Sequence, residues 1–292
     1  MQEFVYERPR TVEEAVAAMR GDDARALAGG TDLIPQLREG RLRTERVVDL
    51  KHIAELTAIS ALPDGGIAIG AAATAAVLSR HATIAANYAA IAQSACLIGG
   101  VQVQNRASLG GNICNAAPSA DAVPALLCHQ ARAVVAGPNG RRELAVEALF
   151  KGPGKTSLEP GEILVAILLP PAQPRSAAKY LRFTPRREMD IAIAGAGTWL
   201  RLDADGAIAE ARIVLASVGP TPMRAPTAEH KLAGERPTRA LLEEAGRLAA
   251  GDARPISDTR GSADYRRSLV AVLTARALAD CCWQLGVGIE TP

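Results

Sequence analysis

This chain of 292 residues has few aromatic residues, no long apolar run and no strong net charge. Phe, Trp and Tyr together make up 3% of it, too few to line a surface on which nucleic-acid bases stack. The formal net charge of +2 is close to zero, so no general attraction to nucleic acid is expected. No stretch of 18 apolar residues occurs, and we therefore expect no membrane span.

Metal-binding and disulfide patterns are also missing. The five cysteines form no C-x-x-C pair, and the four histidines have no zinc-ligand spacing. The chain is therefore expected to hold no metal or iron–sulfur cluster and to keep its thiols reduced. Its first ten residues, "MQEFVYERPR", include no apolar stretch like that of a secretory signal, which favours a cytoplasmic location. The hydrophobic fraction of 48% and the length indicate a globular protein of two or three domains.

The first fifty residues alternate between helix and strand signals. Thr11 and Glu14 form a capping box, and the apolar positions after Thr11 predict a helix that ends near Gly21. Residues 25–28 predict a short strand, residues 32–39 a helix, and residues 46–50 a second strand. A glycine pair lies between the first strand and its helix, in "ALAGGTDLIPQLREG" (26–40).

Later segments predict an α+β arrangement. Residues 75–98 are mostly helical in pattern, and residues 98–127, rich in Gly and Asn, are too polar to predict core. Residues 132–146 predict a hairpin around Pro-Asn-Gly, residues 161–170 predict a strand, and residues 170–174 predict a linker. A long hairpin follows around the turn "DADG" (203–206), and then two helices near 238–250 and 262–285.

Two glycine motifs that resemble nucleotide-binding signatures fail on inspection. "GPGKT" (152–156) ends like a P-loop, but the first glycine of that motif would fall on Leu149. "GAG" (195–197) would need a third glycine where Leu200 stands, and it lies inside a strand pattern that opens no helix. Neither motif therefore predicts a phosphate site.

Two other glycine pairs are better candidates for an anion site. Gly29 and Gly30 precede a helix N-terminus, where amides and the helix dipole favour an anion, and Thr31 adds a hydroxyl. Asp32 could simply cap that helix. The second pair, in "SLGGN" (108–112), has Ser108 and Asn112 as side-chain donors. Each pair alone is more typical of a turn, but two such loops could clamp a diphosphate from both sides.

The ordered set of motifs resembles a known family. "AGGTDL" (28–33), "IGGVQVQNRASLGGNICNAAPSAD" (98–121), "KGPGKTSLEPGEIL" (151–164) and "YLRFTPRREMDIA" (180–192) resemble the FAD-binding medium subunit of molybdenum hydroxylases, such as carbon monoxide and xanthine dehydrogenases. The resemblance implies a vanillyl-alcohol-oxidase-like (PCMH-type) α+β fold. It has two N-terminal α/β subdomains, residues 1–60 and 61–174, and a C-terminal α+β domain with an antiparallel sheet, residues 175–292.

The resemblance also implies which residues hold a non-covalent FAD. The segment with Gly29, Gly30 and Thr31 would hold one side of the pyrophosphate, and the segment 108–112 would hold the other side. Asn115 and Asp121 would lie by the ribityl chain or the flavin ring, with Leu158 packed beside the flavin and Arg182 near it. The loop 184–190, with Arg186 and Arg187, would border the flavin. The implied set is Ala28, Gly29, Gly30, Thr31, Asp32, Ser108, Gly110, Gly111, Asn112, Asn115, Asp121, Leu158 and Arg182. From residue type alone, however, Asp121 would cap a helix and Arg182 would be an exposed strand residue.

By this resemblance the chain is an electron-transfer subunit with no catalytic residue acting on the organic substrate. A large molybdopterin-binding subunit and a small [2Fe-2S] subunit would complete a heterotrimer, which would dimerise. Electrons would reach FAD from the [2Fe-2S] centres and leave to NAD, a quinone or dioxygen. Two alternatives remain open at this point: a stand-alone flavin oxidoreductase and a non-redox nucleotide-binding module.

Overall fold

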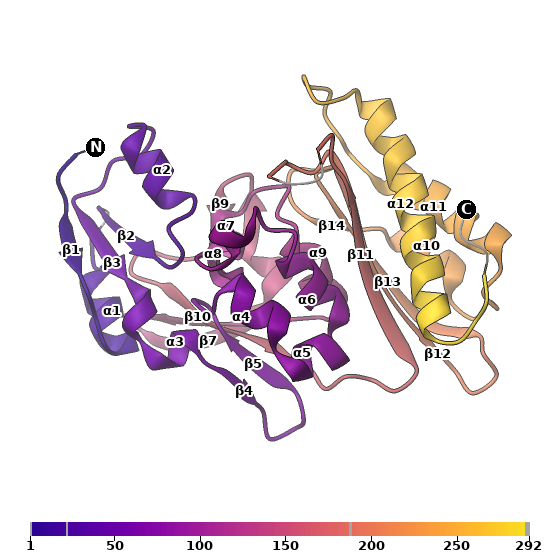
Figure 1. Ribbon diagram of the computed structural model, residues 1–292, viewed down its shortest axis with the longest axis horizontal. Helices are drawn as coiled ribbons and strands as arrows, with labels where there is room; N and C mark the ends of the chain where they lie inside the picture. Colours follow the sequence, from indigo (N-terminus) through magenta and orange to yellow (C-terminus); the bar gives the residue numbers. More distant parts are fainter. Residues whose placement is uncertain (1, 22, 187–188, 290–292) are drawn as a thin grey trace. The chain divides into compact units, whose positions relative to one another are not determined.

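The described chain forms two compact units. The computed structural model describes residues 2–21, 23–186 and 189–289 (Figure 1). Unit 1 comprises Met1–Leu78, Ile98–Ala116 and Gln130–Pro171, and unit 2 comprises Ser79–Leu97, Ala117–His129 and Ala172–Pro292. Two segments from the middle of the sequence thus belong to the same unit as the C-terminal part.

Unit 1 begins with a three-stranded parallel sheet in the order β1-β3-β2. Its elements in chain order are β1 (Val5–Glu7), α1 (Val12–Ala18), β2 (Ala24–Leu27), α2 (Leu33–Arg38) and β3 (Arg46–Asp49). The predicted helices and strands of this region are confirmed. The sequence missed β1, because three residues that are mostly exposed carry no alternation signal.

A five-stranded antiparallel sheet follows, in the order β4-β5-β10-β6-β7. Its strands are β4 (Ile59–Ala61), β5 (Ile67–Gly70), β6 (Arg132–Gly137), β7 (Gly140–Ala145) and β10 (Ile163–Leu169). The central strand is β10, whose apolar sequence matches its burial. The predicted hairpin is β6–β7, and "GPGKT" lies in the small hairpin of β8 (Phe150–Gly152) and β9 (Lys155–Thr156). The rejection of a P-loop there is confirmed.

Short helices complete the first unit. They are η1 (Leu50–His52), α3 (Ala54–Thr57), α7 (Val101–Gln104), α8 (Leu109–Asn115) and η2 (Val146–Leu149), while α4 (Ala75–Arg80) runs across the boundary between the units. Helix α1 begins where the Thr11 hydroxyl accepts a hydrogen bond from the Glu14 amide at 3.1 Å. Its apolar face, with Val12 and Val16, packs on Ile163 and Val165 of β10, and this joins the two sheets of unit 1 into one core.

Unit 2 is built on a four-stranded antiparallel sheet in chain order. Its strands are β11 (Ser176–Phe183), β12 (Ala194–Leu202), β13 (Ile208–Ala216) and β14 (Met223–Arg224). Its helices are α5 (Ala82–Asn87), α6 (Ala89–Ala95), α9 (Ala122–Cys128), α10 (Pro226–Leu232), α11 (Arg239–Asp252) and α12 (Ala263–Gln284). The predicted long hairpin and the last two helices are confirmed. Helix α10, only seven residues long, was missed.

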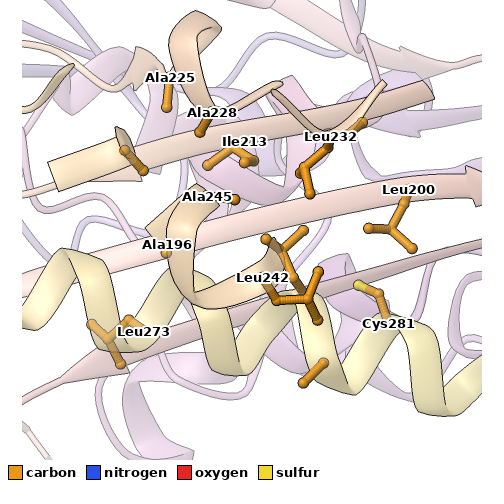
Figure 2. Packing of buried hydrophobic residues seen from close by; sticks show 14 of the residues in the cluster. Ala196, Leu200, Ile213, Ala225, Ala228, Leu232, Leu242, Ala245, Leu273 and Cys281 are labelled. Carbon is orange, nitrogen blue, oxygen red and sulfur yellow. The ribbon is translucent and has the colours of Figure 1, made fainter. Parts of the chain in front are cut away.

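Successive side chains of strand β12 point to opposite faces of the sheet, and each face packs against different helices. Ala196 and Leu200 pack in a cluster with Leu242 of α11 and Cys281 of α12 (Figure 2). On the other face, a Cβ added to Gly197 would lie 2.9 Å from the Cβ of Pro124 in α9. The glycine therefore lets α9 approach the sheet closely.

The expectation that residues 98–127 lie outside the core was wrong. Leu109 and Ile113 of α8 are fully buried, and every residue of α9 is buried. The glycines of this segment allow its helices to pack tightly: a Cβ on Gly110 would lie 2.4 Å from the carbonyl oxygen of Ala71.

The described residues form neither a membrane-spanning helix nor a metal-binding cluster. None of the helices in the described ranges combines the length and apolarity needed to cross a bilayer. Within the same ranges, no three His, Cys, Asp or Glu side chains gather in a way that would hold a metal ion.

Candidate functional site

A cavity of about 370 Å³ lies in unit 1, between the glycine turn after β2 and the beginning of α8. Strand β10 and the segment after β9 complete its wall. Most of the site residues expected from the sequence line it: Ala28, Gly29, Gly30, Thr31, Asp32, Ser108, Gly110, Gly111, Asn112, Asn115 and Leu158. The structure thus brings the two glycine segments, eighty residues apart in the chain, to one cavity.

The two glycines of the first turn serve different purposes. Gly30 has φ +76°, a conformation that residues with a side chain adopt rarely. Gly29 lies against the other segment: an added Cβ would be 2.3 Å from the carbonyl oxygen of Arg106 and 2.8 Å from the Cα of Ala107. Helix α2 follows at once, and the amide of Ile34 donates to the carbonyl of Gly30 at 3.0 Å.

The segment "SLGGN" is a helix N-terminus. The Ser108 hydroxyl caps α8 by accepting a hydrogen bond from the amide of Gly111 at 3.1 Å. Gly110 donates its amide hydrogen to the carbonyl of Ala71 at 3.1 Å, which ties the helix to the end of β5. Sequence reasoning treated these glycines as a turn, although Ser108 has the residue type of an N-cap.

Asn112 supplies the strongest sign of a polar ligand. Its Oδ1 atom is buried and has no hydrogen-bond partner in the described part of the chain. An unsatisfied buried polar atom is costly, so such atoms are normally paired. Because Asn112 lines the cavity, a ligand there can satisfy its amide group.

Charged side chains contribute little cationic character to the cavity. Arg25 is the one Lys, Arg or His among the described lining residues, whereas Asp32 and Glu162 are acidic. The Asp32 side chain makes no capping hydrogen bond to α2, so the prediction that it caps this helix was wrong. Loss of hydration on the cavity side raises the pKa of its carboxyl group. An anionic group here would therefore depend on backbone amides and neutral donors.

Cys114 is the one cysteine among the described lining residues, and its side chain is exposed.

Asp121 and Arg182 are not part of this cavity lining; they belong to unit 2 and contact each other. Asp121 accepts hydrogen bonds from Arg182 and, at 2.8 Å, from the hydroxyl of Tyr180. Both alternatives based on residue type were wrong. Asp121 makes no capping bond to α9, and the Arg182 side chain is 8% exposed. Burial raises the pKa of Asp121, while Arg182 and Tyr180 act in the opposite direction.

Tyr180 was missed by sequence reasoning, although a signal for it existed. A Cβ on Gly195 would lie 2.6 Å from the Tyr180 hydroxyl, so the first glycine of "GAG" leaves room for it. Arg186, on the loop expected beside the flavin, pairs with Asp190 on the surface. Arg187 lies outside the described residues.

Comparison with known proteins agrees with this geometry. Residues 2–172 match the FAD binding domain in molybdopterin dehydrogenase, and residues 179–281 match the CO dehydrogenase flavoprotein C-terminal domain. The chain is 33% identical to the xanthine dehydrogenase FAD-binding subunit of Escherichia coli O157:H7, over 94% of each chain. It is 34% identical to the carbon monoxide dehydrogenase medium chain of Afipia carboxidovorans, over 94% of this chain and 95% of the relative.

A solved structure extends the likeness to the fold. The carbon monoxide dehydrogenase of Hydrogenophaga pseudoflava that lacks the Mo-pyranopterin moiety contains a chain that superposes with a TM-score of 0.92 at 31% identity, covering 97% of this chain and 98% of that one. The fold and site thus define a flavoprotein of the α+β FAD-binding class. Within that class, the chain belongs to the family of FAD-binding medium subunits of carbon monoxide and xanthine dehydrogenases.

Proposed function

We propose that the cavity of unit 1 holds FAD and that the two glycine segments clamp its pyrophosphate. The observation that carries this proposal is the meeting of the 28–33 turn and the α8 N-terminus at one cavity. Asn112 Oδ1, a buried acceptor without a partner among the described residues, would accept a hydrogen bond from a hydroxyl group of the same ligand. The amides of Gly29 and Gly30 and the hydroxyl of Thr31 would bind one phosphate. At the start of α8 the amides of Gly110 and Gly111 already donate to Ala71 and to the Ser108 hydroxyl, so the side-chain Nδ2 of Asn112 would donate to the other phosphate.

The rest of the predicted site completes the proposal. Asn115 and Leu158, which line the same cavity, would contact the ribityl chain and the flavin. Asp121 and Arg182 are proposed to lie near the flavin ring, with Tyr180 and Asp121 holding the guanidinium in one orientation. No residue of this chain needs to act on an organic substrate. The division into residues 1–60, 61–174 and 175–292 stays part of the proposal.

We further propose that the chain works inside a complex. A larger molybdopterin-binding subunit would oxidise the organic substrate, and a small [2Fe-2S] subunit would conduct the electrons. FAD, when bound, supplies two-electron and one-electron chemistry that connects these centres to an external acceptor: NAD, a quinone or dioxygen. The heterotrimers would pair into a larger assembly. Relatives at similar identity are named for xanthine and for carbon monoxide, so similarity alone selects no substrate.

Thr31→Ala tests the clamp. Losing one hydroxyl contact of about 1 kcal/mol should weaken FAD binding roughly fivefold. Titration of the FAD-free chain with FAD, followed by flavin fluorescence, measures the dissociation constant. Thr57→Ala is the matched control, because Thr57 is exposed on α3 and is not among the cavity residues. Equal affinities for Thr31→Ala and the wild type, with Thr57→Ala also unchanged, would remove Thr31 from the clamp.

A further inference from the structure

The segment 156–162 forms part of the cavity wall and is held in place by Arg142, which is not among the residues that line the cavity. Thr156, Leu158 and Glu162 line the cavity, and strand β10 begins at the next residue. The Pro160–Gly161 turn shapes the segment, with φ +81° at Gly161 and a hydrogen bond from the Glu162 amide to the carbonyl of Glu159 at 2.9 Å. What fixes this segment therefore also fixes one wall of the cavity.

An ion pair fastens the segment to the edge strand β7. The guanidinium of Arg142 donates two hydrogen bonds to the Glu162 carboxylate, both at 2.7 Å. A third bond runs from Arg142 to the carbonyl of Ser157 at 3.3 Å. The same carboxylate accepts from the Glu159 amide at 2.8 Å, so one pair holds three points of the segment.

The fold makes room for this pair. Strand β6 lies between β10 and β7 in the sheet, and the pair must pass over it. It does so at Gly137, where an added Cβ would lie 2.7 Å from the Cγ of Glu162. The Glu162 side chain is 9% exposed, which separates this pair from an ordinary surface contact. The Arg142 hydrogen bonds lower the pKa of Glu162, so its carboxylate stays charged near neutral pH.

We infer that Arg142 and Glu162 are positioning residues that hold Leu158 and its neighbours against the bound cofactor and thereby slow its release. The inference rests on the proposed FAD site. Neither side chain needs to contact the reacting atoms. The pair acts by keeping the 156–162 segment in its observed position while FAD is bound.

Strand β7 offers a matched control in the preceding residue. Arg141 also makes a bidentate pair, with Glu55 of α3, the bond from Nη2 measuring 2.9 Å. Successive residues of a strand point to opposite faces, so the two arginines serve opposite sides of the sheet. Neither Arg141 nor Glu55 lines the cavity. Removing the Arg141–Glu55 pair costs a surface interaction, whereas only the Arg142–Glu162 pair fastens the cavity wall.

The experiment measures the FAD dissociation rate of the full-length chain. FAD-loaded protein is mixed with an excess of an apoflavoprotein that traps free FAD, and the change in flavin fluorescence gives the rate. The variants are Arg142→Gln, Glu162→Gln and the double variant, with Arg141→Gln and Glu55→Gln as controls. Melting temperatures of the FAD-free proteins record any general loss of stability.

We expect Arg142→Gln and Glu162→Gln to release FAD about three to ten times faster than the wild type, with no further increase in the double variant. The controls should release FAD at the wild-type rate, and their melting temperatures record the loss of the Arg141–Glu55 pair. The inference would be overturned if Arg142→Gln and Glu162→Gln released FAD at the same rate as the two control variants, or if their effects added in the double variant. The proposed FAD site would be unaffected by either result. A wild-type chain that binds no FAD would overturn the proposed function and this inference with it.

Discussion

Gly29 and Gly30 show how two identical neighbouring residues answer different physical requirements. Gly30 is needed for its positive φ, and Gly29 is needed because the backbone at Arg106 and Ala107 lies where a Cβ would stand. The second requirement links the two halves of the proposed clamp. It cannot be read from the sequence, since it depends on a contact between segments almost eighty residues apart.

Gly29→Ala should therefore push the two segments apart. Overpacking of this kind costs about 1–3 kcal/mol, and we expect the melting temperature to fall and the FAD dissociation constant to rise at least tenfold. Gly251→Ala is the control, because Gly251 lies in helix α11 with nothing within 4 Å of an added Cβ. That change should leave stability equal or slightly higher. Wild-type FAD affinity in Gly29→Ala would show that the spacing of the two segments does not matter for binding.

At the scale of elements, the sequence predicted those helices and strands that are specified by local signals. The capping box of α1, the hairpin β6–β7 and the pair of long helices α11 and α12 were all anticipated, because caps, turns and periodicity are local. Residues 98–127 were misjudged as too polar for the core. Gly and Asn indicate exposure when the sequence is taken alone, and the close helix packing that the glycines allow depends on the rest of the fold. Likewise, Asp121 and Arg182 were expected by residue type to be solvated, and only the three-dimensional pairing explains their burial.

His129, the residue that follows helix α9, is a buried imidazole that gives unit 2 a predictable response to acid. His129 is 8% exposed, its ring meets Tyr88 edge-on at 5.3 Å, and burial with the nearby charge of Arg212 lowers its pKa to about 4. Between pH 6.5 and about 4 the unfolded chain takes up a proton that the folded chain does not. Stability is therefore retained above pH 6.5 and lost as the pH falls through this range, by roughly 3 kcal/mol in total.

His129→Phe removes this titration and keeps a ring of similar size. The melting temperature of the wild type should fall more steeply between pH 6.5 and 4 than that of the variant, and the difference between the two curves isolates His129 from Asp121, whose raised pKa acts in the opposite sense. His230→Gln, at an exposed position on α10, should follow the wild type. Parallel curves for the wild type and His129→Phe would show that His129 does not control the acid response.

At the scale of the whole molecule, the candidate cofactor cavity lies within one of the two units. Unit 1 contains the complete cavity lining, so the proposed pyrophosphate clamp needs no residue from unit 2. The relatives of this chain are named as FAD-binding subunits and medium chains of dehydrogenases.

We propose that this chain is the FAD-binding electron-transfer subunit of a molybdenum-containing complex, and purification of the native complex, followed by flavin and metal analysis, tests this proposal. We expect one FAD per copy of this chain, released by acid into solution, together with molybdenum and iron on co-purifying larger and smaller subunits. A colourless protein, or an FAD protein that turns over a substrate alone with no molybdenum partner, would contradict it.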